Sequence, residues 1–224
     1  MQKLRSRLLS SDANKQLILF DLDGTLARGN VSFAFGRYLR KNGFLSTWRA
    51  LLLACIYCLQ KMHVLSLRSL HVVSFYLLFY KKQQMIIERL AHQFVQTEGE
   101  GALLLREELV EEMERAKTRG DIVWIASSSP QFLVQAVASY LGIEHVLGTS
   151  YEADDLGRYK KVCEVIDGDK KCLLLKKYPH TYVTAYSDSI LDRSLLEAVQ
   201  TAIAVFPDHQ LKKIALKNGW KIME

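Results

Sequence analysis

A short apolar run that ends in two closely spaced carboxylates constrains this chain more than any other sequence feature. Residues 17–20 (LILF) precede residues 21–26 (DLDGTL). This pattern predicts a buried parallel strand, and ligand sites in open α/β sheets lie where such strands end. Gly24 allows a sharp turn, which keeps Asp23 near Asp21. Because neighbouring carboxylates repel unless a cation or a shared proton stabilises them, we predict a magnesium site and a carboxylate nucleophile. A solvated turn is the alternative.

Residues 21–26 resemble the first motif of the haloacid dehalogenase superfamily of phosphatases and phosphotransferases. The resemblance implies that Asp21 is the nucleophile, that Asp23 is the general acid and base, and that Gly24 and Thr25 support the site. It also implies three further elements in a fixed order. They are a hydroxyl at the end of a second strand, a lysine at the start of a helix, and paired acids after a third strand.

A second strand is expected over residues 121–126, and Ser127-Ser128-Ser129-Pro130 follow it. Ser127 is the best match to the family, whose members of this type carry Ser-small-Ser-Pro here, and its hydroxyl can donate to a phosphoryl oxygen. Ser128 is expected to bind substrate beside it. Pro130 suits the first turn of the next helix, with Ser129 as its cap. The alternative is that all three serines only cap or turn the chain.

Two lysines within residues 168–175 are candidates for the third element. Subfamily members often read Gly-acid-acid-Lys here, which selects Lys171 and leaves Lys170 as the alternative. An ammonium at this place would offset the charges of Asp21 and of a phosphoryl group. A solvated helix start is the competing interpretation.

The fourth element follows a strand expected at residues 182–186. The resemblance implies that Asp188 binds the metal and that Asp192, one helical turn later, supports the site. The implied cofactor is Mg²⁺, held by Asp21, Asp188 and the backbone carbonyl of Asp23. Arg28, just after the first motif, is expected to contact the substrate.

The order of the expected elements predicts an α/β fold with a helical insertion. Between residues 29 and 100 we expect helices and no strand, whereas helices and strands alternate afterwards. The expected helices are 31–42, 46–60, 64–82, 83–97, 103–118, 130–141, one that begins near Lys171, 191–199, and one from Pro207-Asp208 to Gly219. The expected strands are 17–20, 121–126, 145–147, 182–186 and 202–206, and residues 149–167 are expected to form a hairpin or an irregular excursion.

This order predicts a Rossmann-like, parallel-sheet core of residues 1–28 and 101–224. An all-helical cap, residues 29–100, is inserted after the first motif. The insertion resembles the cap of subfamily IB, which contains phosphoserine phosphatase. Such caps cover the site, exclude water and help to select the substrate.

The insertion is both basic and apolar. Residues 28–96 contain ten Lys or Arg and one acid, Glu88, and 22 of the 30 residues from Leu51 to Tyr80 are apolar. Neither charge-free stretch, at 50–60 or at 69–80, reaches the roughly 20 residues of a membrane span. Trp48, Tyr57, Tyr76 and Tyr80 with basic flanks favour peripheral contact with an anionic bilayer. The alternative is a helical core whose arginines face water and phosphate, and no nucleic acid is expected as a partner.

The substrate expected from these features is a lipid phosphate. The basic, apolar insertion resembles the phosphatidylglycerophosphatase C group of bacterial enzymes. Phosphoserine phosphatases usually carry a Glu soon after the first motif to hold the amino group, whereas residues 27–35 contain no acid. A phosphatase for a small soluble metabolite, a phosphotransferase and a non-catalytic lipid-binding module are the alternatives.

Other features bear on the compartment. The segment Met1 to Gln16 lacks the apolar run of a secretory signal. We therefore expect the protein in the cytoplasm or at the cytosolic face of the inner membrane. The four cysteines fit a reducing compartment. Cys55 and Cys58 form a C-x-x-C without a matching second pair, so buried thiols are favoured over a zinc site.

Overall fold

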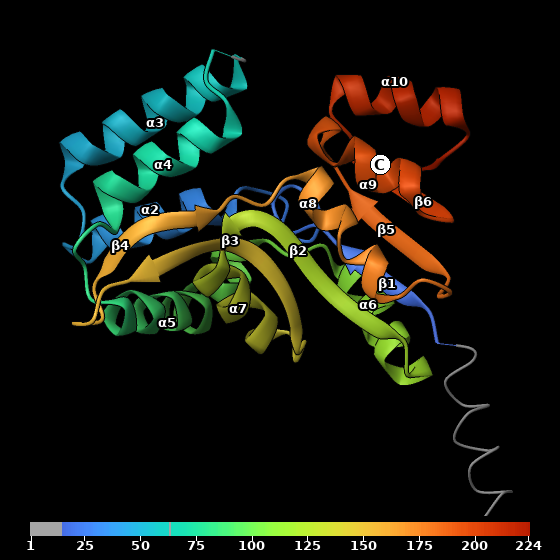
Figure 1. Cartoon of the computed structure of the whole chain (residues 1–224), viewed down its shortest axis with the longest axis horizontal. Coiled ribbons are helices and arrows are strands. Elements are labelled where there is room, and N and C mark those ends of the chain that lie inside the picture. The colour runs from blue at the N-terminus through green and yellow to red at the C-terminus, as the bar shows by residue number, and fades with distance from the viewer. Residues whose placement is uncertain (1–14, 63) are drawn as a thin grey trace, which may run out of the picture.

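The computed structural model of the protein describes residues 15–62 and 64–224, and a seven-stranded sheet runs through its centre (Figure 1). The strand order is β4-β3-β2-β1-β5-β6-β7, and every neighbouring pair is parallel except β3 and β4. The strands are β1 (Leu17–Phe20), β2 (Ile122–Pro130), β3 (His145–Ala153), β4 (Tyr159–Glu164), β5 (Val183–Ser187), β6 (Thr201–Val205) and β7 (Lys221–Met223).

Helices cover both faces of this sheet. Four of them lie between β1 and α6 in the chain, and the others connect the later strands. They are α2 (Val31–Lys41), α3 (Thr47–Lys61), α4 (Leu67–Leu78), α5 (Gln84–Leu103), α6 (Glu107–Arg119), α7 (Gln131–Tyr140), α8 (Gly168–Cys172), α9 (Arg193–Ala198) and α10 (His209–Asn218), with the 3-10 turns η1 (Leu175–Lys177) and η2 (Ile190–Asp192). In Figure 1, α5 and α7 lie below the sheet, and α9 and α10 lie above it.

The alternation of side chains along β1 divides the apolar core in two. Ile18 and Phe20 pack with buried residues of α2, α5, α6 and α7 on one face. Leu17 and Leu19 pack with buried residues of α9 and α10 on the other face. Because successive strand residues point to opposite sides, a wholly apolar run is what a strand covered on both faces requires.

The first and last helices of the insertion belong to the larger of these clusters. Phe94 of α5 lies against Phe35 and Tyr38 of α2, with ring centroids 5.6 and 5.5 Å apart. Helix α2 begins at a side-chain cap, since the Asn30 side chain accepts from the Phe33 N–H. Helices α3 and α4 pack on each other and stand above β3 and β4 in Figure 1.

The α/β fold class predicted from the sequence is confirmed, and the elements differ in detail. For residues 149–167 the sequence left a hairpin and an irregular excursion open, and the structure has a hairpin of β3 and β4. Helix α5 continues to Leu103, so the next helix begins later than expected, and the short strand β7 was not predicted. Cys55 and Cys58 are exposed, against the expectation of buried thiols, because they lie on the outer face of α3.

Within residues 15–62 and 64–224 we find no helix that combines the length and the apolarity needed to cross a bilayer. The expectation for the N-terminal segment concerns residues that lie almost entirely outside the described part of the chain. The division into a core and a cap at residues 29–100 stays a prediction.

We expect Phe94→Ala to destabilise the protein by about 3–5 kcal/mol, because it leaves a cavity between α2 and α5. Phe94 is fully buried, whereas Leu216 on α10 is 66% exposed. Urea unfolding followed by circular dichroism measures the change, with Leu216→Ala as the control. Equal losses in the two variants would contradict the packing described for α5.

Candidate active site

Three parallel strands end at one edge of the sheet and bring the predicted residues together. Strands β2, β1 and β5 are neighbours. Asp21 follows β1, Asp188 follows β5, and Ser127 lies near the end of β2. The chain builds the sheet outward from β1 to β3 and later returns to β5, so β1 lies at a topological switch point, where crevices for ligands form.

The Lys171 ammonium joins two carboxylates in a buried ion cluster. Its Nζ donates to Asp21 Oδ1 and to Asp192 Oδ2, both at 2.7 Å, and Lys171 is only 3% exposed. Ser187 Oγ also donates to Asp192 Oδ2, at 2.7 Å. Lys170, whose side chain is 43% exposed, pairs with Glu164 instead. Of the two lysines that the sequence left open, Lys171 is the one that contacts Asp21.

The close approach of α8 to η2 places Lys171 in this cluster. Helix α8 begins where the Asp167 side chain accepts from the Lys170 N–H. A Cβ added at Gly168 would lie 2.3 Å from the Leu191 carbonyl oxygen, so only glycine fits there. One turn later Lys171 therefore points between β1 and η2.

Burial and mutual repulsion shift the titration of the cluster. Burial raises the pKa of Asp21, and the charges of Asp192 and Asp188 raise it further, although the Lys171 ammonium lowers it. Burial and the Asp192 charge raise the pKa of Asp188 to about 6. Burial alone would lower the pKa of Lys171, but the two carboxylates raise it above its ordinary value. The site therefore holds excess negative charge that a cation would stabilise.

Thr25 and Gly24 connect the first loop to Asp188. Thr25 Oγ1 lies 3.4 Å from Asp21 Oδ2 and 3.3 Å from Asp188 Oδ1, so its single hydroxyl proton can serve either carboxylate. Gly24 has φ +83°, and a Cβ there would lie 2.1 Å from Asp188 Oδ2. The predicted supporting role of Gly24 thus has a steric reason, because any larger residue would displace Asp188.

Asp23 is held from two sides. Its Oδ1 accepts from the Val31 N–H at 2.6 Å, at the N-terminus of α2. Its Oδ2 accepts from Ser127 Oγ at 3.0 Å and from Ser129 Oγ at 2.6 Å. Ser32 of α2 lies 2.6 Å from Ser129 and donates to it, because the Ser129 proton is already used. The carboxylate therefore connects the sheet to the insertion.

The expected helix cap at Ser129 is wrong. Helix α7 begins after Pro130 without a side-chain cap, and the Ser129 hydroxyl turns to Asp23 instead. Strand β2 continues past residue 126, so Ser127 and Ser129, two residues apart, point to the same side. A longer strand in the sequence analysis would have identified Ser129.

Two further residues that the sequence analysis missed hold the loops of the site. Arg106 donates from Nε to the Thr25 carbonyl at 3.1 Å, and its guanidinium lies 3.8 Å from the ring centroid of Phe206. Asp208 Oδ2 accepts from the Ile190 N–H at 2.7 Å, and its own N–H donates to the Asp188 carbonyl. Arg106 lies 81 residues from Thr25 and no sequence motif marks it, whereas the sequence analysis identifies Asp208 only as the start of the last helix.

A cavity of about 300 Å³ opens over the cluster and is roofed by the insertion. Asp21, Lys171 and Asp188 line its floor. The Ser128 side of the core and helices α2, α3 and α4 form its walls, and most of the side chains that the helices contribute are apolar. The apolar lining from the insertion is Phe33, Phe35, Leu45, Ala50, Leu53, Tyr57, Leu67, Leu70, Leu78 and Phe79.

Polar groups of the insertion interrupt this lining at a few points. Arg37 and Arg40, one turn apart on α2, lie on the wall of the cavity. Burial lowers the pKa of His71 to about 4, so the imidazole is neutral at physiological pH. Arg28 is exposed and is not among the lining residues, so the geometry gives its expected substrate contact no support. Ser127 is fully buried behind Asp23, whereas Ser128 lines the cavity.

The donor set fits a hard cation that keeps most of its own ligands. Asp21 and Asp188 both reach the Thr25 hydroxyl, and carboxylates with raised pKa values favour a divalent cation. Among the residues described, no three His, Cys, Asp or Glu side chains form a metal-binding group. Mg²⁺ typically takes one or two protein carboxylates together with water and phosphate oxygens, so two are enough. The Asp23 carboxylate is occupied by the serines, which leaves its backbone for the role expected from the sequence.

Comparison with known proteins matches this arrangement. The model of the haloacid dehalogenase-like hydrolase family matches residues 18–197. A phosphoserine phosphatase of Mycobacterium tuberculosis is 29% identical over 231 residues, which cover 92% of this chain and 69% of the relative. A Bordetella pertussis protein of unknown function has a TM-score of 0.83 at 21% identity, over 94% of this chain and 99% of that chain. A phosphoserine phosphatase crystallised as a phospho-aspartyl intermediate analogue has a TM-score of 0.63 at 17% identity, over 94% and 93%.

We expect Lys171→Met to destabilise the metal-free protein by about 3–5 kcal/mol at about pH 8, because two buried carboxylates lose their cation. Without the ammonium that lowers it, the pKa of Asp21 rises further above its unfolded value, so the folded state binds more protons and the penalty shrinks towards about pH 5. Urea unfolding in EDTA at the two pH values measures the difference.

Lys170→Met is the matched control for that experiment, because the side chains of Lys170 and its partner Glu164 are 43% and 49% exposed. It should change stability by less than about 1 kcal/mol. A penalty in Lys171→Met that stays constant between the two pH values would show that the ion cluster does not determine it.

Proposed function

The chain belongs to the haloacid dehalogenase-like hydrolase family and is a phosphoserine-phosphatase-like phosphatase. From this premise we propose that it is a Mg²⁺-dependent phosphomonoesterase that acts on a membrane lipid phosphate through an aspartyl-phosphate. The observation that carries the substrate proposal is the apolar lining above Asp21. The phosphoryl chemistry rests on the ion cluster below it.

Asp21 is the proposed nucleophile. One of its carboxylate oxygens forms a bond to phosphorus as the bond from phosphorus to the ester oxygen breaks. Asp23 gives a proton to the leaving ester oxygen. Water then attacks the aspartyl-phosphate, returns a proton to Asp23 and releases inorganic phosphate with a free Asp21. Asp23 is held 2.6 Å from the Val31 N–H and between two serine hydroxyls, which fixes its position for both transfers.

Lys171 and the serines supply the remaining groups. The Lys171 ammonium, 2.7 Å from Asp21 Oδ1, is placed to offset charge on the transferred phosphoryl group. Ser127 and Ser128 are the proposed donors to its oxygens, Ser127 by turning its hydroxyl from Asp23. Asp21, Asp188 and the Asp23 carbonyl would hold Mg²⁺, which when bound offsets phosphate charge and orients the group.

The walls of the cavity favour an apolar leaving group. Every carboxylate that lines it belongs to the sheet side, at Asp21, Asp23, Asp167, Asp188 and Asp192. The part of the lining that comes from α2, α3 and α4 therefore offers no carboxylate to the ammonium of an amino-acid phosphate. It offers aliphatic and aromatic surface, whose burial against acyl or glyceryl carbon is favourable by about 25 cal/mol per Å².

Arg37 and Arg40 favour a second negative charge on the same substrate. They lie on one face of α2 and line the cavity, and neither has a carboxylate partner among the described residues. Arg37 lies over the Phe33 ring, 5.8 Å from its centroid. Guanidinium groups recognise phosphate well, so a leaving group with an internal phosphodiester, as in phosphatidylglycerophosphate, is the proposed best substrate.

Phosphoserine or a related soluble ester is the second candidate. The relative that is 29% identical is a phosphoserine phosphatase, and this likeness covers most of the chain. With this substrate, Arg37 and Arg40 would bind the carboxylate of phosphoserine. The absence of an acid from residues 27–35 counts against it.

We expect Mg²⁺ to raise the melting temperature of the protein, and Asp188→Asn to remove most of that increase. Protons compete with the cation for the carboxylates, and the pKa of Asp188 is about 6. The increase should therefore be larger at about pH 8 than at about pH 5. Thermal unfolding with Mg²⁺ and with EDTA measures it. A Mg²⁺ effect that is unchanged in Asp188→Asn would contradict the assigned metal site.

We expect Mg²⁺-dependent phosphate release from phosphatidylglycerophosphate in mixed micelles, with a lower KM than for phosphatidic acid, which lacks the second charge. Asp21→Asn should reduce kcat by about a thousandfold or more without loss of the fold. Arg37→Gln with Arg40→Gln should raise the KM for phosphatidylglycerophosphate towards that for phosphatidic acid. The measurement is phosphate release from these lipids, phosphoserine, and sugar and nucleotide monophosphates.

Turnover of phosphoserine alone would replace the lipid proposal with the second candidate and keep the chemistry. Near-normal activity in Asp21→Asn would contradict the nucleophile. If the protein is folded and binds Mg²⁺ but releases phosphate from none of these esters, the proposed phosphatase function is contradicted.

A further inference from the structure

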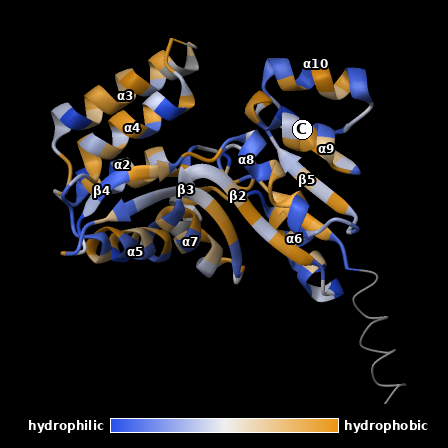
Figure 2. Cartoon of the chain, in the orientation of Figure 1, coloured by the Kyte–Doolittle hydropathy of each residue, from blue (hydrophilic) through white to orange (hydrophobic). Residues whose placement is uncertain are grey.

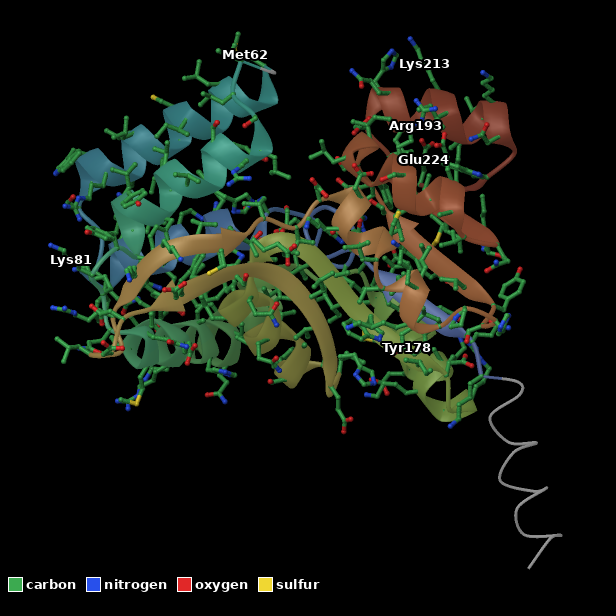
Figure 3. The ribbon with its side chains drawn as sticks, viewed as in Figure 1. Met62, Lys81, Tyr178, Arg193, Lys213 and Glu224 are labelled. Atoms are coloured by element: carbon green, nitrogen blue, oxygen red, sulfur yellow. The ribbon has the colours of Figure 1, made fainter. Side chains whose placement is uncertain are left out.

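Helix α3 exposes an apolar stripe to solvent along its whole length. We define this outer stripe as Trp48, Leu51, Leu52, Cys55, Leu59 and Met62. Trp48 is 60% exposed, Leu51 63% and Met62 71%. The residues recur at intervals of three and four, so they lie on one face of the helix. Figure 3 places Met62 at the end of the α3–α4 hairpin, far from the sheet.

The opposite face of α3 is apolar as well. Ala50, Leu53 and Tyr57 line the cavity above Asp21, and Ile56 is buried. Figure 2 shows hydrophobic residues around both α3 and α4. A surface helix normally turns charged side chains to water, as α6 does with Glu107, Glu108 and Glu111. Helix α3 therefore has one apolar face more than the fold uses, and exposed patches of this kind mark interaction surfaces.

The charge of the hairpin identifies the chemistry of the partner. Residues 41–82 contain six Lys or Arg and no Asp or Glu. Arg49 flanks the stripe and lies 5.4 Å from the Trp48 ring centroid, and Lys81 lies 5.4 Å from that of Tyr80. Tyr76 and Tyr80 of the same hairpin are 53% and 40% exposed. Aromatic and basic side chains around an apolar strip are the composition of a segment that lies in a bilayer interface.

A second copy of the chain fits this surface poorly. An isologous contact would bring together two copies of residues 41–82, each with six basic residues and no carboxylate. An anionic membrane supplies the missing negative charge, and each basic residue near such a surface adds to the attraction. We infer that the outer stripe of α3 docks the protein on an anionic lipid bilayer, with α3 in the interface plane.

This docking deepens the proposed function and rests on it for its purpose. Helix α3 would contact the bilayer with its outer stripe, while Ala50, Leu53 and Tyr57 on its other side line the cavity above Asp21. A lipid phosphate leaving the membrane would meet apolar surface on both sides of the helix, and its anionic head would meet Arg37 and Arg40 on α2. The insertion would then act as a membrane-facing lid.

The test is co-sedimentation with vesicles that contain no phosphomonoester, so the active site plays no part. We expect the protein to bind phosphatidylcholine vesicles that contain phosphatidylglycerol. Vesicles of phosphatidylcholine alone should bind it at least about tenfold more weakly. Added salt should weaken binding to the anionic vesicles. Trp48→Gln with Leu51→Gln should also weaken it about tenfold, because the two changes remove apolar surface that the bilayer would bury. Both changes leave the net charge of the protein unaltered.

Leu216→Gln is the matched control. Leu216 is 66% exposed, much as Leu51 is at 63%, but it lies on α10 and not on the α3–α4 hairpin. Control binding should equal that of the unaltered protein. No binding to anionic vesicles, or equal binding by the stripe variant and the control, would overturn the inference. A dimer in solution that the stripe variant dissociates would assign the surface to a second copy instead.

The two proposals fail separately. Hydrolysis of lipid phosphate in micelles without binding to vesicles would overturn the docking surface and leave the substrate intact. Vesicle binding with turnover of soluble esters alone would overturn the lipid substrate and leave the docking surface.

Discussion

The buried contact between Lys171 and the carboxylates of Asp21 and Asp192 is the interaction on which the site depends. Each charge is costly to bury alone, and the Lys171 ammonium, 2.7 Å from an oxygen of each carboxylate, stabilises both. The contact joins β1, α8 and η2, three segments that are far apart in the sequence. It also leaves the site with more negative than positive charge, since Asp188 lies beside it. The same cluster that holds the loops together therefore attracts a cation and a phosphoryl group.

Asp23 extends this network into the insertion. Two of its hydrogen bonds come from β2, at Ser127 and Ser129, and one comes from the first helix of the insertion, at the Val31 N–H. The position of the proposed acid thus depends on how α2 sits over the sheet. Helix α2 in turn is fixed by its aromatic contacts with Phe94 of α5. Packing of the insertion and placement of a reactive carboxylate are one structural problem, which explains why this carboxylate does not simply face solvent.

The sequence predicted those features that a strand end or a local motif encodes. Asp21 directly follows an apolar run and Asp188 is separated by one residue from the expected strand 182–186, so their edge of the sheet could be inferred before any contact was known. The choice between Lys170 and Lys171 could not, because neighbours on a helix point about 100° apart and only tertiary packing sets the phase. Tyr57, which the sequence analysis groups with the aromatic residues of a membrane contact, lines the cavity, since α3 is apolar on both of its faces. Arg106 reaches Thr25 across 81 residues, a distance over which sequence patterns carry no signal.

The distribution of charge ties these observations to an orientation. The chain carries a net charge of +6, and residues 28–96 carry +9, so the rest sums to −3. An anionic surface would attract residues 28–96, which include α3 and α4, more strongly than the rest of the chain, and would so turn the α3–α4 end of the molecule towards the membrane. The apolar stripe alone would not distinguish this from self-association. The charge does, because it makes the same surface unfavourable for a second copy and favourable for a lipid headgroup layer. Recognition of a phosphorylated lipid and attachment to the bilayer that contains it would then use one pair of helices.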